Sequence, residues 1–276
     1  MLELPESQVM ASNIHASVVG KRIESVLSNA TPHVFAFYHG DPAGYHNLLA
    51  GKMIGQAQAF GGQVEISADD ACLVINDGIN MRLYPNGVKR PDKHQLLLEL
   101  SDGSALVCTV QMYGGMQAFT KGTYNNPYYL IAKTKPSPLD NSFDETYFYK
   151  LMDDSKQTLS AKSFLATEQR IPGLGNGVLQ DILFNARIHP KTKLSAISKE
   201  NKNRLFVSVK ETLREMTAKG GRNTEKDLFG KTGGYACILS KNTLDTPCPI
   251  CGDTILRQAY LGGTIYFCPT CQPEGK

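Results

Sequence analysis

The sequence predicts an α+β protein with an N-terminal antiparallel β-sandwich, a helical domain and a small cysteine-rich hairpin at the C-terminus. Three observations lead to this prediction. Short strand-like runs separated by turn signals dominate the first half of the chain, and helical apolar periodicity then replaces them. Four cysteines stand in two close pairs near the end. We place the domains at residues 1–132, 143–240 and 241–276, with a linker at 133–142.

Length and composition fit this division and narrow the function classes. A chain of 276 residues is long enough for two domains and a small third module. No apolar run approaches the roughly 18 residues that a membrane span needs, and no secretory signal opens the chain, so we expect a cytoplasmic protein. The 29 Lys and Arg residues nearly balance the 26 Asp and Glu residues, so nucleic-acid binding must be argued from placement.

The first domain begins with a helix and continues as strands. Apolar residues recur near helical spacing in ESQVMASNIHASVVGKRI, and Gly20 ends this helix. Strand-like runs follow in VFAFYH, QVEISA, ACLVIND, MRLY, QLLLEL and ALVCTVQMY, with turn signals at Asp77-Gly78, Asn86-Gly87 and Asp102-Gly103. Short strands at this spacing predict an antiparallel sandwich or barrel, and LLLELSDGSALVCTV is the clearest hairpin.

The linker KTKPSPLDNS is polar and holds two prolines, and helical patterns follow it. Four segments have a helical apolar face: FDETYFYKLM, AKSFLATEQRI, GVLQDILFNARI and NKNRLFVSVKETLREMTAKG. The second and third of these enclose a glycine-rich turn, so the unit is predicted to be helix, glycine turn, helix.

The four C-terminal cysteines form the strongest motif, C-x2-C, sixteen residues, C-x2-C. Four thiolates at this spacing predict a zinc ribbon with one tetrahedral ion, at roughly 2.3 Å per Zn–S bond. The site is structural, because four protein ligands leave no open position for catalysis. A two-residue turn at Gly262-Gly263 suits the intervening hairpin. The alternative is disulfides or unrelated thiols at the ligand positions Cys248, Cys251, Cys268 and Cys271.

The glycine turn GLGNG, residues 173–177, has two interpretations. Asn176 is placed to cap the following helix, and the glycines on either side, such as Gly175, let another backbone approach its first N–H groups. A helix N-terminus behind such a turn is a natural phosphate cradle. The alternative is a tight corner between two helices that needs glycine for packing alone.

Several blocks together resemble the formamidopyrimidine-DNA glycosylase and endonuclease VIII family. KSFLATEQRIPGLGNGVLQDILFNARIHP is similar to its helix–two-turn–helix, and MLELPES to its M-P-E-L-P-E start. KHQLLLELSDGSALV resembles its K-H-x-H strand and hairpin, and CPICG with YFCPTCQ its zinc finger. These blocks follow in the family's order over residues 1 to 272, so the resemblance covers nearly the whole chain.

This resemblance implies a two-domain clamp that grips bent duplex DNA and flips the damaged base out of the stack. It also implies that residues 143–240 form a DNA-binding helix–two-turn–helix domain. Lys162 and Asn176 match the family residues that hold the phosphates beside the lesion. Tyr113 keeps an aromatic side chain that can stack on a base, or it is a core tyrosine. His94 matches the K-H position, where it touches the DNA backbone or is a structural imidazole.

The reaction residues match less well. In the family, the amine of an N-terminal proline attacks C1′ and forms a Schiff base, and a neighbouring glutamate handles protons. Here Leu2 replaces the proline, so Met1 should be retained and its primary amine lies one residue too early. Glu3 matches the catalytic glutamate and Glu6 the second carboxylate. Either glutamate could instead activate a water, which would give a glycosylase without a lyase step.

Three cationic DNA contacts of the family are also replaced. Gln63 stands for a lysine, Gln111 for the arginine of the loop that fills the gap left by the flipped base, and Gly263 for the arginine of the zinc finger. Their loss weakens phosphate neutralisation and flattens the salt dependence of binding.

Two functions from different classes follow. The first is a DNA repair glycosylase that releases a flipped base from damaged double-stranded DNA, with altered chemistry. The second is a non-catalytic protein that binds damaged or bent DNA. A third idea, an interaction protein that has left DNA altogether, fits less well with Lys162, Asn176 and the zinc hairpin. We expect a monomer, nucleoid-associated if the source is bacterial, with one structural Zn²⁺ and no membrane partner.

Overall fold

The computed structural model describes residues 2–274, except the side chains of Asp77 and Gln111. The chain forms two compact units, Met1–Lys133 with Gly220–Gly234, and Thr134–Lys219 with Tyr235–Lys276. The segment 220–234 therefore belongs with the N-terminal sheet, whereas the predicted helical domain includes it. The predicted domain boundaries stay a prediction. No helix among the described residues is long and apolar enough to span a bilayer.

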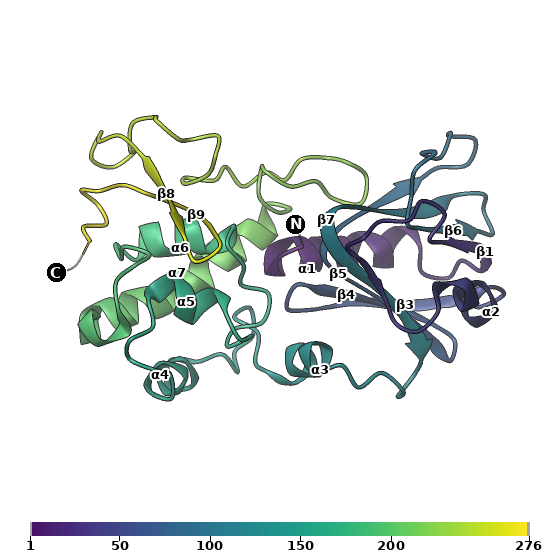
Figure 1. Cartoon of the computed structure of the whole chain (residues 1–276), viewed down its shortest axis with the longest axis horizontal. Helices are drawn as coiled ribbons and strands as arrows, with labels where there is room; N and C mark the ends of the chain where they lie inside the picture. Colours follow the sequence, from purple (N-terminus) through teal and green to yellow (C-terminus); the bar gives the residue numbers. More distant parts are fainter. Residues whose placement is uncertain (1, 275–276) are drawn as a thin grey trace. The chain divides into compact units, whose positions relative to one another are not determined.

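The first unit is built on one sheet of seven strands (Figure 1). Its path runs β1-β6-β7-β5-β4-β3, and β2 pairs in parallel with β7. All other pairs are antiparallel. The strands are β1 (Ile23–Ser28), β2 (Ala36–Tyr38), β3 (Ile54–Phe60), β4 (Gln63–Ala68), β5 (Ala71–Tyr84), β6 (Leu96–Leu100) and β7 (Ala105–Thr120).

Two long strands join the halves of the sandwich. β5 and β7 pair along most of their length, so the runs ACLVIND and MRLY belong to one strand. The predicted turn at Asp77-Gly78 is wrong, because the β5–β7 register shifts between Asp77 and Ile79 as at a β-bulge. A Cβ on Gly78 would lie 2.2 Å from the Tyr113 carbonyl oxygen, so only glycine fits this approach. The predicted hairpin around Asp102-Gly103 is confirmed as β6–β7.

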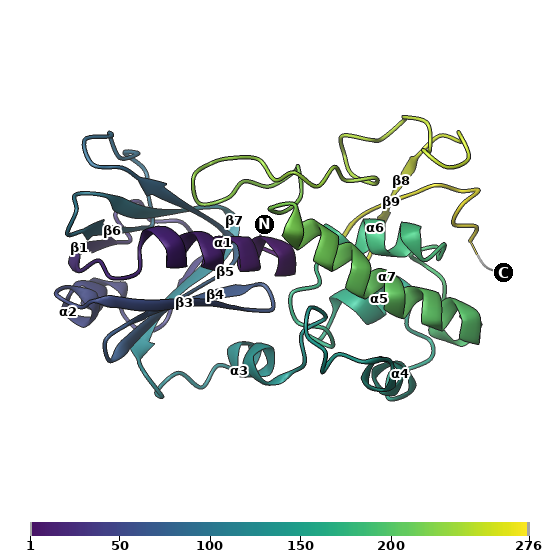
Figure 2. The same ribbon diagram turned by 180° about the vertical axis from the view of Figure 1, so that it is seen from behind.

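Three helices accompany this sheet: α1 (Leu4–Ser17), α2 (Tyr45–Leu49) and α3 (Pro127–Thr134). The predicted opening helix is confirmed as α1, which packs against β3 and β4 (Figure 2). Its apolar face at Met10 and Ile14 joins a core made by strands from both halves of the sheet. A buried Tyr45 extends this core and donates its hydroxyl hydrogen bond to the Met116 carbonyl, at 2.9 Å.

The second unit is helical with a two-stranded hairpin. It holds α4 (Glu145–Asp153), α5 (Ala161–Ala166), α6 (Val178–Asn185), α7 (Lys199–Ala218), β8 (Leu256–Tyr260) and β9 (Gly263–Phe267). Side chains cap three of its helices, because Asp144, Ser160 and Ser198 each accept a backbone N–H from three residues later. The chain therefore has the predicted α+β class, with a sandwich, helices and a terminal hairpin.

The helix–turn–helix differs from its prediction at both edges of the turn. α5 ends at Ala166, since Glu168 and Gln169 have φ of 57° and 47°, in the left-handed region. α6 begins at Val178 with Gly177 as its N-cap residue and no side-chain cap bond. The prediction that Asn176 caps α6 is therefore wrong, and its side chain instead donates a hydrogen bond to the Thr264 carbonyl.

Candidate functional site

The first turn of α1 buries two carboxylates. Glu3 is 4% exposed and Glu6 is 7% exposed. Glu3 is the extended residue before the helix, with φ −106°, and Pro5 follows in the first turn, where its missing N–H costs nothing. Leu2 is buried in the sheet core and anchors the chain just before these carboxylates. Met1, the predicted source of an amine nucleophile, lies outside the described residues.

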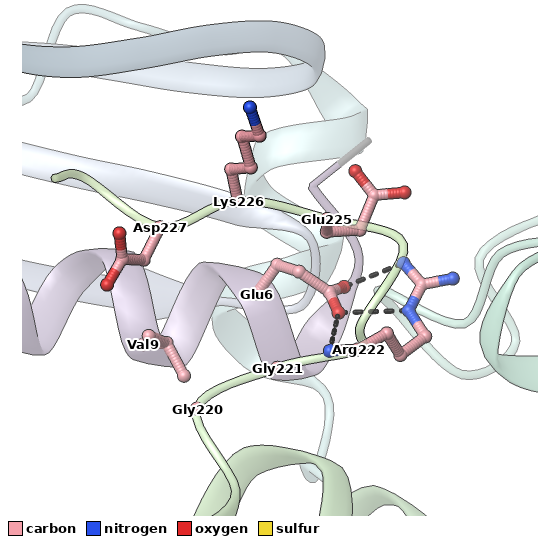
Figure 3. A pocket seen from close by; sticks show the side chains of 8 residues that line it. All are labelled: Glu6, Val9, Gly220, Gly221, Arg222, Glu225, Lys226 and Asp227. Carbon is pink, nitrogen blue, oxygen red and sulfur yellow. Dashed lines mark hydrogen bonds and ion pairs between the residues drawn. The ribbon is translucent and has the colours of Figure 1, made fainter. Parts of the chain in front are cut away.

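Arg222 holds these carboxylates, and the sequence did not reveal it. Its Nε and backbone N donate to Glu6 Oε1 at 2.9 and 3.1 Å, and its Nη2 donates to Oε2 at 2.8 Å (Figure 3). Its Nη1 lies 3.6 Å from Glu3 Oε2. The arginine side chain is only 3% exposed, so one guanidinium is enclosed between two buried carboxylates.

The electrostatics of this cluster favour the charged forms. Burial alone raises the pKa of the Glu6 carboxyl, but the charge and hydrogen bonds of Arg222 outweigh burial and lower it below its usual value. Burial opposes the charge on Arg222, yet Glu3 and Glu6 raise the pKa of its guanidinium above its usual value. Glu6 is thus an ionised acceptor with both oxygens occupied, which leaves it poorly suited to activate a water.

The loop that carries Arg222 is fixed to the sheet unit. Leu228 is fully buried in the sheet core, and its carbonyl accepts the Leu83 amide at 2.9 Å. Asp227 Oδ1 accepts the amides of Phe229 and Lys231 at 3.0 and 2.8 Å, which closes a turn. Residues 220–234 therefore form an ordered loop over the start of α1.

A small pocket opens between this loop and α1 (Figure 3). Acidic and basic side chains dominate its lining, which consists of Glu6, Val9, Gly220, Gly221, Arg222, Glu225, Lys226 and Asp227. In the close-up, Lys226 points away from the Glu6–Arg222 pair, and both members of that pair line the pocket.

Lys162 and Asn176 come together in the second unit, against the β8–β9 hairpin. Lys162 Nζ donates to the Tyr260 carbonyl at 2.6 Å, and Asn176 Nδ2 donates to the Thr264 carbonyl at 2.9 Å. Burial lowers the pKa of the Lys162 ammonium, and Asn176 Oδ1 is buried with no partner among the described residues. The pair is thus covered by hairpin backbone, whereas an open glycine turn was expected.

Gly263 permits this close packing. A Cβ at that position would lie 3.2 Å from Lys162 Nζ and 3.5 Å from Asn176 Oδ1. The predicted hairpin turn is displaced by one residue, because Leu261 and Gly262 have φ of 49° and 68° and Gly263 already pairs with Tyr260. At the other side of the glycine turn, the Gly175 carbonyl accepts the Leu179 amide at 3.3 Å.

The four C-terminal cysteines converge as a metal site would require. Their sulfurs all lie within 4.8 Å of one another, with 3.7 Å between Cys248 and Cys271 and 3.4 Å between Cys251 and Cys268. Tetrahedral zinc with Zn–S bonds of about 2.3 Å needs sulfurs about 3.8 Å apart, so the cluster fits. Burial raises the pKa of the Cys248 thiol, but the amides of Ile250 and Cys251 lower it to about 7.

Comparison with known proteins gives the family. Residues 135–227 match the formamidopyrimidine-DNA glycosylase H2TH domain. Formamidopyrimidine-DNA glycosylase from Geotalea uraniireducens is 30% identical over 280 residues, which cover 99% of this chain and 100% of that protein. This chain belongs to the formamidopyrimidine-DNA glycosylase family. The relative from Legionella pneumophila is 28% identical over 281 residues, covering 99% of each chain.

A solved structure of the family extends the match to the fold. Lactococcus lactis Fpg, in a complex with DNA that contains an oxidised pyrimidine, superposes with a TM-score of 0.82 at 25% identity. The match covers 99% of this chain and 100% of that one.

The remaining predicted DNA contacts of this glycosylase-family chain lie on its sheet unit. Tyr113 is on β7 and 39% exposed, so it is not a core tyrosine. His94 is buried just before β6, where Nδ1 lies 3.2 Å from the Pro91 carbonyl oxygen and Nε2 has no partner among the described residues. Gln63 is buried too, and its Nε2 donates to the Tyr128 carbonyl at 3.2 Å. Gln63 stands for a lost DNA contact in the sequence analysis, whereas contact of Tyr113 and His94 with DNA stays a prediction.

Proposed function

We propose that this chain is a DNA N-glycosylase that binds damaged double-stranded DNA and releases a flipped base. The observation that carries the proposal is the pair of buried carboxylates at the start of α1, held by a buried arginine in a chain of the formamidopyrimidine-DNA glycosylase family. Burying two carboxylates is costly unless they are paired, which favours a functional reason for their position.

Glu3 is our candidate for the catalytic group, with Glu6 as its support. Arg222 occupies both oxygens of Glu6 with hydrogen bonds, so Glu6 is poorly suited to act on a water. The Nη1 of Arg222 forms an ion pair with Glu3 Oε2 at 3.6 Å, so the same arginine stabilises the charged form of Glu3. Glu3 would take the proton of a water whose oxygen bonds to C1′. The bond from C1′ to the base nitrogen breaks, and the base leaves with the electron pair and a proton from solvent. The amine of Met1 is the alternative nucleophile.

A panel of lesion-bearing duplexes, each incubated with and without borohydride, tests this proposal. Base loss without a trapped adduct indicates activated water, and a borohydride-trapped adduct indicates an amine nucleophile. We expect Glu3→Gln to slow base release about a thousandfold at unchanged duplex affinity. Mass spectrometry of the intact chain reports whether Met1 is retained. Duplex binding with no base loss from any lesion would contradict the glycosylase.

Non-catalytic recognition of damaged DNA is the second candidate, and one observation favours it. Leu2 stands where the family's nucleophilic proline would be, and its side chain is buried in the sheet core. This candidate predicts tight binding to lesion duplexes and no product, so the same panel separates it from the glycosylase.

Binding of DNA is proposed to use Lys162, Asn176 and Gly175 on the helical unit, together with Tyr113 and His94 on the sheet unit. The relative bound to DNA with an oxidised pyrimidine supports a damaged duplex as the partner. Cys248, Cys251, Cys268 and Cys271 would hold one structural Zn²⁺ that fixes the hairpin beside Lys162. We propose that the protein acts as a monomer.

A further inference from the structure

We propose that Arg222 is the positioning residue of the catalytic carboxylate, so that the 220–234 loop is part of the catalytic centre. Arg222 acts through Glu3 and Glu6 and does not itself touch the reacting atoms. This inference rests on the proposed glycosylase function and names a residue that the family match alone does not supply.

The geometry gives the two carboxylates different roles. Glu6 receives three hydrogen bonds from Arg222, at 2.8 to 3.1 Å, and this fixes the guanidinium plane. The remaining corner of the guanidinium, Nη1, then faces Glu3 at 3.6 Å. Glu6 therefore orients the arginine, and the arginine orients Glu3.

A carboxylate that acts as a base at this buried position needs a neighbouring positive charge, and Arg222 supplies it. Two buried carboxylates repel each other, and burial favours their protonated forms, so without a cation at least one would lose its charge near neutral pH. The Arg222 side chain is 3% exposed, so its charge acts on both carboxylates within the protein interior and keeps them ionised. One guanidinium and two carboxylates together carry a net charge of about −1. A protonated Glu3 could not accept a proton from a nucleophile.

Loop packing shows that Arg222 is held in place rather than resting on the surface. Gly221, with φ +94°, turns the chain into the arginine, and a Cβ on Gly233 would lie 2.3 Å from the Gly221 carbonyl oxygen. Leu228 anchors the loop in the sheet core. Lys121, directly after β7, is by contrast exposed and lies outside this loop, so the sheet unit offers a control cation away from the cluster.

The test is a double-mutant cycle between Arg222→Gln and Glu3→Gln, measured as single-turnover base release at saturating protein. Arg222→Gln should slow base release about a hundredfold, the scale of a misplaced catalytic group, while duplex Kd changes less than about threefold. In the Glu3→Gln background, Arg222→Gln should cost less than about threefold more, because a residue acting through Glu3 has nothing left to position.

Arg222→Lys keeps the positive charge but loses the planar guanidinium that can donate to two carboxylates at once. It is the second variant to measure if Arg222→Gln does not fold. It should retain the circular dichroism spectrum and slow base release about tenfold. Lys121→Gln, the matched control, should leave the rate unchanged, because Lys121 is an exposed lysine of the sheet unit outside the 220–234 loop and the pocket. Normal rates in Arg222→Lys and Arg222→Gln, or additive losses in the cycle, would overturn the inference and leave the glycosylase standing. Wild-type protein that releases no base from any lesion overturns the glycosylase, and the inference with it.

Discussion

At the residue scale, the candidate site depends on a contact that no local pattern reveals. Arg222 and Glu6 are 216 positions apart, and Arg222 sits in a polar, glycine-rich stretch typical of a solvated loop. The sequence could identify Glu3 and Glu6 through the resemblance of MLELPES to a family start. It could not identify their partner, because an ion pair between distant segments exists only once the loop has packed.

Stability against acid is the first consequence of the Glu6–Arg222 pair. Glu6 has a pKa below its ordinary 4.5 in the folded chain, so its pairing contributes stability that is present above about pH 4.5 and is lost as pH falls through the lower folded value. Glu6→Gln should lower the free energy of unfolding by about 3 kcal/mol at pH 7 and flatten its decline below pH 4.5, in urea titrations across this range.

Glu24→Gln is the control for that titration, because Glu24 is exposed on β1 and its loss should change the free energy of unfolding by less than about 0.5 kcal/mol. A Glu6→Gln protein whose stability at pH 7 equals the wild type would show that the buried pair contributes nothing net.

Lys162 offers a second prediction at this scale. Its ammonium lies under the hairpin with a hydrogen bond to the Tyr260 carbonyl, so a phosphate must compete with that carbonyl for it. If it does contact a phosphate, Lys162→Met should reduce the slope of log Kobs against log salt by about one. Fluorescence anisotropy on a lesion duplex measures this slope. Lys156→Met, at an exposed lysine of the same unit, should leave it unchanged, and equal slopes for both variants would remove Lys162 from the interface.

At the element scale, periodicity predicted most strands and helices, and the errors have physical causes. The apolar pattern of residues 71–84 fits two strands joined by a turn as well as one strand with a bulge at Gly78. Only the pairing of the whole segment with β7 shows that it is one strand. β1 and β3 were missed because their burial alternates irregularly, with exposed residues in neighbouring positions. α5 is shorter than its apolar pattern because the chain turns left-handed at Glu168 and Gln169.

The bulge makes a prediction about Gly78. A Cβ there would lie 2.2 Å from the Tyr113 carbonyl oxygen, and backbone atoms of two long paired strands cannot move away cheaply. Gly78→Ala should therefore lower the free energy of unfolding by about 3 kcal/mol, the upper range for overpacking. Gly44→Ala is the matched control, because a Cβ there meets nothing within 4 Å. Equal melting temperatures for the two variants would mean that the bulge tolerates a side chain.

At the scale of the whole molecule, the chain keeps the family's fold, and its sequence has Leu2 where the family resemblance implies a proline. The α+β fold, the helix–turn–helix and the cysteine hairpin were all predicted from sequence, because each depends on local periodicity or spacing. The hydrogen bonds of Lys162 and Asn176 were not predicted, since they depend on how closely β9 approaches through Gly263. We expect the cysteine cluster to affect DNA binding, because it lies in the same unit as these hydrogen bonds.

Zinc removal should therefore weaken DNA binding through the hairpin. The cysteine pairs precede β8 and follow β9, at the open end of the hairpin. Near its turn, the carbonyls of Tyr260 and Thr264 accept hydrogen bonds from Lys162 and Asn176. We expect one zinc per chain by elemental analysis, and a loss of duplex affinity of about tenfold or more when a chelator removes it, restored by added Zn²⁺. Cys251→Ser should lose both zinc and affinity without restoration, whereas Cys72→Ser, in the sheet unit, should keep both. A metal-free protein with unchanged affinity would mean that the helical unit holds its DNA contacts without the hairpin, and Lys162 would then have to be ordered by α5 alone.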